Sequence, residues 1–284
     1  MDGVGLLQTG SIVLLNSAFA WICGALFSAW CLRHAAFPSI RFVSRSSALA
    51  ACACLTGALL ALWCACALMA DVRLGPALGM LSNMLVDTAY GRAGLVSVAA
   101  MAAVALITLV RPCFILPALL LLVFALARAS MSHAAEHGIA SAGTLLEAMH
   151  LLFVALWAGV VAVAGWRVLP KAEPGGKDTA SYLAAISSAA TLALAGIVAT
   201  GLWNAWQRIE TLEQMTSHSY GIALTVKLGL FALAACLGAW NRFVGFPAAK
   251  CEPARAIAVL RIESLVLLAA FVAAAILTLQ EPPR

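Results

Sequence analysis

Long apolar runs dominate this sequence, and they restrict it to very few folds. About eight of them approach the roughly twenty residues with which a helix crosses about 30 Å of hydrocarbon. Their approximate ranges are 12–32, 48–70, 93–110, 113–132, 143–169, 182–205, 221–241 and 256–280. Backbone groups find no water in lipid, and the runs do not alternate as barrel strands do, so they must be helices. The sequence predicts an all-α polytopic integral membrane protein.

Composition agrees, because 64% hydrophobic and 10% charged residues leave too little polar surface for a soluble globule. The N-terminal segment carries an acid and no basic run, so we interpret the first run as a membrane helix rather than a signal peptide. We expect membrane lipid around the chain and no binding of nucleic acid. Most of the nine cysteines lie in apolar runs, which argues against a disulfide framework.

The orientation is predicted from the charges between the runs. Connections after the odd-numbered runs hold most of the basic residues: Arg33, Arg41, Arg45, Arg111, Arg167, Lys171, Lys177, Arg242, Lys250 and Arg255. The other side holds Arg73, Arg92, Arg128, Arg208 and Arg284. The positive-inside rule then places both termini on the periplasmic side of a bacterial inner membrane.

Two external connections look alike and suggest an internal repeat. Residues 75–86 have leucines at helical spacing and predict a short amphipathic surface helix, and 208–219 is similar. A Tyr-Gly pair follows each, at 90–91 and 220–221, and a Thr-Gly pair precedes each, at 56–57 and 200–201. We interpret 1–142 and 143–284 as two related four-helix halves.

Histidines gather at the external end of the fourth and fifth runs. His133 and His137 are four residues apart, so a helix would present both from one face, and His150 lies deeper in the next helix. Met131 and Met149 flank them. Imidazoles and thioethers are ligands that copper accepts, so we predict an external-side copper site formed by these five residues.

Alternatives without a metal remain open for these residues. Methionine often fills apolar helices, the two rim histidines could simply be solvated, and His150 could hydrogen bond to a neighbouring helix. Glu147 fits a capping box that begins at Thr144, which explains it without ligation. The Cys-x-Cys pairs at 52–54 and 64–66 point to different helix sides, as packing residues do.

Five further polar residues lie inside apolar runs: Asn16, Asn204, Lys227, Asn241 and Glu263. We expect Asn241 and Glu263 to bond across helices, and Lys227 either to reach the interface or to pair with a buried acid.

Several short patterns together resemble the copper resistance protein D (CopD) family of bacterial inner-membrane proteins. They are Ser132-His133, His150 with Trp157-Ala-Gly159, Thr200-Gly201 with Asn204, Tyr220-Gly221 with Leu224 and Lys227, Asn241-Arg242, and Glu263. The resemblance covers about 130–280, and 182–280 looks like the defining domain of the family. It implies an eight-helix protein of the cytoplasmic membrane that takes part in copper uptake or tolerance, often beside a small periplasmic copper-binding partner.

We therefore expect a non-enzymatic copper transporter or permease. The sequence has no G-x-x-x-x-G-K-[ST] loop for ATP, so we expect transport to be passive or driven by an ion gradient. Two alternatives are a membrane redox protein with a b-type haem between two histidines, and a receptor or assembly factor that passes copper to a partner without transporting it.

Overall fold

The computed structural model describes residues 3–33, 40–110, 113–132, 138, 141–173, 175–206, 219–249 and 252–278. Within these ranges it describes all side chains except those of 40–44, 204–206 and 219–220. Almost all of the described residues are helical and none of them forms a strand, which confirms the all-α membrane fold.

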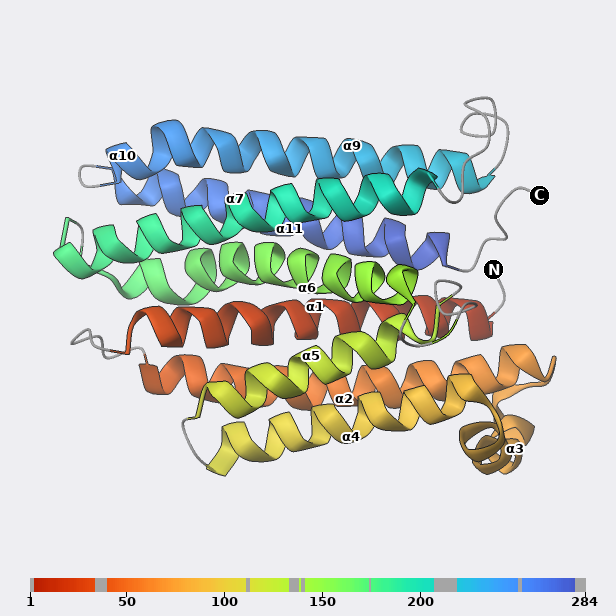
Figure 1. The fold of residues 1–284 in the computed structure, drawn as a ribbon. Coiled ribbons are helices and arrows are strands. Elements are labelled where there is room, and N and C mark those ends of the chain that lie inside the picture. Colours follow the sequence, from red (N-terminus) through yellow and green to blue (C-terminus); the bar gives the residue numbers. More distant parts are fainter. Residues whose placement is uncertain are drawn as a thin grey trace.

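The long helices form a bundle in which they lie roughly parallel or antiparallel to one another (Figure 1). In chain order, the helical segments are α1 (Gly3–Cys31), α2 (Ile40–Met69), α3 (Leu74–Asp87), α4 (Ala89–Val110), α5 (Ile115–Ala129), α6 (Ala142–Val163), η2 (Ala164–Val168), η3 (Leu169–Lys171), α7 (Lys177–Trp206), α9 (Ser219–Trp240), η4 (Asn241–Gly245), α10 (Phe246–Ala248) and α11 (Pro253–Leu277). Two of the short segments, η2 and η4, are π-helical turns that continue α6 and α9.

Seven helices of the described chain are long and apolar enough to cross a membrane. The remaining apolar run forms α5, which has 15 residues and so spans about 22 Å. α1 begins and α11 ends at the end of the bundle where α3 lies (Figure 1), as an even number of crossings requires. The count of eight crossings, with α5 as the short one, stays a prediction.

The surface helix expected at 75–86 is confirmed as α3. Its apolar side faces the bundle, since Ala77 and Met84 are buried. Trp63 of α2 donates from its indole Nε1 to the carbonyl of Leu74 at 2.9 Å, which fixes the start of the helix. α3 therefore lies across one end of the bundle rather than through it (Figure 1).

α1 and α6 cross with their backbones in close contact. Gly24 and Gly159 face each other, and a Cβ atom on either would overlap the backbone of the other helix, at Gly159 and at Ala20 respectively. Such contacts between small residues let membrane helices approach until their backbones touch. In Figure 1, α1 and α6 lie side by side, with α2, α4 and α5 on one side of them and α7, α9 and α11 on the other.

This arrangement places α1–α5 and α6–α11 in two groups. The groups share one hydrophobic core, because α1 also packs against α11 and α5 packs against α6. The proposed repeat of 1–142 and 143–284 stays a prediction.

Arginine and tryptophan gather at the end of the bundle opposite α3. Three arginines lie over indole rings there at 4.7 to 5.0 Å from the centroid: Arg33 on Trp30, Arg255 on Trp240 and Arg261 on Trp166. Aromatic belts mark both interfaces of membrane proteins, and an excess of positive charge marks the cytoplasmic one. The clustering supports the predicted orientation, which itself stays a prediction.

Replacing Gly159 by alanine tests the α1–α6 crossing. The added methyl group must push the helices apart, so we expect a loss of about 1–3 kcal/mol in stability, as for other overpacked positions. Gly229→Ala is the matched control, because a Cβ there meets nothing within 4 Å and alanine favours a helix. Thermal unfolding in detergent measures both, and equal melting temperatures for the two variants would contradict the crossing.

The orientation is tested with a tag after Arg284. If both termini are periplasmic, the tag is reached by a membrane-impermeant reagent in intact spheroplasts. Labelling that requires opening of the inner membrane would refute it.

Candidate functional site

His150 of α6 is hydrogen bonded to α7 at the end of the bundle predicted to be external. Its Nδ1 lies 2.9 Å from Oγ1 of Thr200, and Thr200 is 5% exposed. Close packing beside the pair holds the two helices together, because Gly196 leaves room for the ring of Phe153, which a Cβ would overlap. The sequence analysis left open whether His150 bonds to a neighbouring helix. The structure shows that it does, and that the partner is Thr200.

The hydrogen bonds of Thr200 determine which nitrogen of His150 carries the proton. The Thr200 hydroxyl donates its one hydrogen to the carbonyl of Gly196 at 2.6 Å, so towards His150 its oxygen can act only as an acceptor. In the neutral ring, Nδ1 is then the donor and the lone pair is on Nε2. This is how the ring of a metal-binding histidine is oriented by a partner on its other nitrogen.

A second polar contact lies deeper, between α6 and α11. The indole Nε1 of Trp157 donates to Oε1 of Glu263 at 3.0 Å. Both side chains are buried, at 3% and 1% exposure. The ring of Phe231 on α9 packs edge-on against Trp157 with centroids 5.6 Å apart, so this contact joins α6, α9 and α11.

The third polar position is Asn241, at the start of η4. It is 1% exposed, and neither its Oδ1 nor its Nδ2 has a hydrogen-bond partner among the described residues. The next residue, Arg242, reaches across to α7, where it donates to Ser187 Oγ at 3.0 Å and Thr191 Oγ1 at 2.7 Å. π-Helical turns such as η4 often occur at functional sites.

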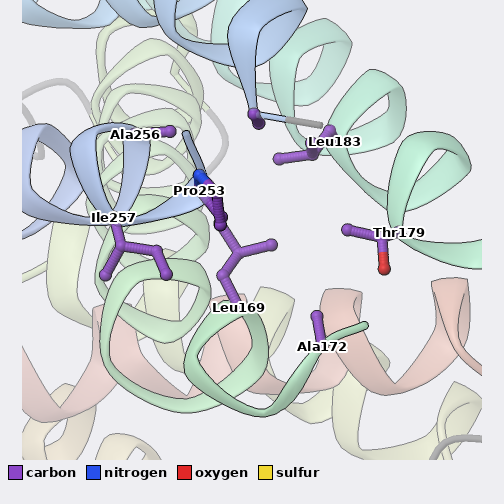
Figure 2. Close-up of a pocket in the computed structure, with 8 residues that line it drawn as sticks. Leu169, Ala172, Thr179, Leu183, Pro253, Ala256 and Ile257 are labelled. Carbon is purple, nitrogen blue, oxygen red and sulfur yellow. The ribbon is translucent and has the colours of Figure 1, made fainter. Parts of the chain in front are cut away.

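Two hollows lie at the end of the bundle where Arg242 is found, which is predicted to be cytoplasmic. The hollow in Figure 2 is small and mostly apolar, lined by Leu169, Ala172, Thr179, Leu183, Ala249, Pro253, Ala256 and Ile257. A larger one beside it adds Ser187 and Arg242 to its lining. The four helices α6, α7, α9 and α11 therefore carry polar groups at successive depths between the two ends.

The expected copper ligands are only partly within the described chain. His133 and His137 lie outside the described residues. Met131 is half-buried and its sulfur is 4.0 Å from a guanidinium nitrogen of Arg128, whose charge would oppose a copper cation. Met149 is 44% exposed and lies a different way around α6 from His150. Among the described residues, no three His, Cys, Asp or Glu side chains form a group that could hold a metal.

The predicted capping box of α6 is wrong. The N-cap is Ser141, whose hydroxyl accepts from the amide of Thr144 at 3.2 Å, and Thr144 is buried in the first turn. Thr144 itself donates to the carbonyl of Gly138 at 3.0 Å. The earlier serine takes the cap because the helix starts three residues before the expected position.

One cysteine of each Cys-x-Cys pair lies in a helix contact, while Cys52 is exposed. Cys54 and Cys66 are buried, and their thiols donate to the carbonyls of Leu15 and Ala77 on neighbouring helices. Lys227 is half-buried on the stripe of α9 that includes Phe231.

Residues 183–277 match the family model described as copper resistance protein D. This chain carries a CopD domain. The match runs from α7 to the end of α11 and includes Thr200, Asn241 and Glu263. No curated protein and no solved structure matches the chain. The chain is therefore a copper-related, multi-pass membrane protein.

The CopD domain contains one partner of the His150–Thr200 contact and one partner of the Trp157–Glu263 contact, and α6 supplies the other partner of each. Sequence reasoning named His150, Thr200, Trp157 and Glu263 separately, but it missed that they form two pairs. Their order in the family pattern pointed to these four residues. Spacing along one helix, however, does not reveal a contact between two helices.

Thr200→Val keeps the shape of the side chain but removes the oxygen that His150 bonds. We expect a loss of about 0.5–1.5 kcal/mol in stability, the net contribution of one hydrogen bond. Thr225→Val is the matched control, since Thr225 makes the same bond to the carbonyl four residues earlier but is exposed. Equal melting temperatures of the two variants in detergent would rule out the pairing.

Proposed function

We propose that this protein is a transporter or permease that moves copper across the bacterial inner membrane. The observation that carries the proposal is the His150–Thr200 pair. It holds an imidazole inside a membrane bundle with its lone pair on Nε2, in a chain that carries a CopD domain. Ionisable groups at membrane depth are costly and usually mark pathways for ions or substrates.

The polar groups below His150 support transport over simple binding. Glu263 and Asn241 lie deeper in the same group of helices, and Ser187 and Arg242 line the hollow at the far end. A receptor would need polar groups at one end alone. Copper is the cargo, and it enters from the periplasmic or the cytoplasmic end.

The rim histidines complete the proposal from the sequence. His133 and His137 precede α6 and would collect copper at the external end, before His150 takes it deeper. Met131 and Met149 have a smaller part, given the Arg128 contact of the first and the exposure of the second. A small periplasmic copper-binding protein is the partner that would deliver or accept the ion.

The haem alternative needs two facing histidines at one depth. The described residues contain one histidine, His150, so they offer no such pair. Absence of a Soret band from purified protein that still binds copper would separate the two functions.

Copper uptake into proteoliposomes tests the proposal. We expect His150→Ala to slow copper movement more than His133→Ala or His137→Ala, because the deeper site is the one where copper must lose water. Thr200→Val should weaken copper binding about 10- to 100-fold, as loss of a partner behind a histidine ligand does. A triple alanine variant of the three histidines that folds normally and moves copper like the parent would refute the proposal.

The pH dependence gives an independent check. Imidazole binds a metal through its neutral form, so protons compete with copper. The unperturbed pKa of a histidine side chain is about 6.5. Copper affinity should therefore be full well above this pH and fall as the pH drops through it. Affinity that stays constant from pH 7.5 to about pH 5 would argue against histidine ligands.

A further inference from the structure

Glu263 is an acid in an unusual place. It is the eleventh residue of the 25 in α11 and is 1% exposed. The other aspartates and glutamates of the described chain lie in connections, within the first two turns of a helix or in its last turn. The function proposed above uses the depth of this carboxyl group but gives it no chemical role.

The surroundings of Glu263 are dry and nearly uncharged. Its Oε1 accepts one neutral hydrogen bond from Trp157, and its Oε2 has no partner among the described residues. On the α9 side, a Cβ on Gly238 would come within 3.0 Å of Oε1, so glycine makes room for the carboxyl group. Phe231 closes the space beside the indole ring.

The charged groups nearest to Glu263 along the sequence and on the neighbouring helices have other partners. α1 has no charged residue between Gly3 and Cys31. Arg261 donates to the carbonyl of Gly165, and Arg167 lies over the ring of Trp21. The other charged or titratable groups on α11 and on the elements packed against it are Arg255 on α11, Glu147 and His150 on α6, Lys171 on η3, Tyr220, Lys227 and Cys236 on α9, Arg242 on η4, and Cys23 and Cys31 on α1.

This environment favours the protonated acid. A buried carboxylate with one neutral donor loses its hydration without gaining a counter-charge, so it takes up a proton instead. A copper cation in the bundle reverses the preference, because a positive charge in a medium of low dielectric constant favours the ionised carboxylate. Copper and a proton therefore compete through charge.

We propose that Glu263 is a proton-carrying site that exchanges protons for copper during transport. The inference rests on the proposed copper transport and names its coupling ion. When copper enters the bundle, the O–H bond of Glu263 breaks and one proton leaves towards the side from which copper came. When copper leaves, the carboxylate binds one proton from the side that received it. Protons then move opposite to copper.

The experiment uses the full chain in liposomes that contain a pH-sensitive dye, with copper ions supplied outside. Copper content and luminal pH are measured together. For the parent we expect copper to enter while the lumen becomes alkaline, and an imposed pH gradient that is acidic inside to speed copper entry. Glu263→Gln keeps the size and the acceptor for Trp157 but cannot release a proton. It should lose the pH change, down to the level of protein-free liposomes, and the response to the gradient.

Glu252→Gln is the matched control, an identical change at an exposed residue before α11. It should behave as the parent. A second readout follows the proton directly: infrared difference spectra on copper addition should lose a protonated carboxyl band in the parent and in Glu252→Gln, and show no such loss in Glu263→Gln. This measurement applies even if the glutamine variant moves copper slowly.

Each outcome separates the two proposals. If the parent moves no copper, the transport function fails and the exchange fails with it. If the parent moves copper with no proton movement, or with protons in the same direction, the exchange alone is wrong. Glu263→Gln that keeps both the pH change and the infrared band loss would also overturn it.

Discussion

The close approach of α1 and α6 is the constraint on which the rest of the bundle depends. In lipid, apolar side chains gain little by leaving their surroundings, so helices associate where backbones can come close enough for many short contacts. Gly24 and Gly159 provide that place. Trp157 lies two residues before Gly159 on the same helix, so the crossing that fixes α6 also fixes the donor that bonds Glu263. The structural glycine and the buried polar contact therefore belong to one local arrangement on α6.

The unit that could handle an ion is larger than the CopD domain matched at residues 183–277. α7, α9 and α11 supply Thr200, Phe231 and Glu263, but their partners His150 and Trp157 lie on α6, before the match begins. Without α6, a buried carboxyl group would have no donor and Thr200 no histidine. α6 in turn needs α1, which shows why the domain is embedded in a longer bundle rather than standing alone.

Hydropathy was sufficient to predict the helices, because a chain in lipid must bond its own backbone. It overestimated the fourth run: Phe114 and the residues after Ala129 leave the helix, and α5 is left with 15 residues. The position of His150 inside an apolar run predicted that it is important, and the family resemblance included Thr200 and Glu263. The contacts themselves could not be predicted, because they depend on the rotation of each helix about its axis. Met149 shows this: one residue from His150, it lies on an exposed side of α6. The cap at Ser141 was missed because two hydroxyl residues compete at that start and only one can precede the first turn.

The hydrogen bonds at the two ends of the α6–α11 group also limit how it could work. At one end His150 ties α6 to α7, and at the other Arg242 ties η4 to α7 through Ser187 and Thr191. The π-helical turn of η4 widens the helix at the point where Arg242 must turn towards α7. Between these ties, Trp157 and Phe231 fill the interior with aromatic rings. If copper passes along this group as proposed, it meets these hydrogen bonds and the aromatic rings on its way. Because α7 takes part in both ties and packs mainly against α6, a change in the position of α7 would alter both ends of the group.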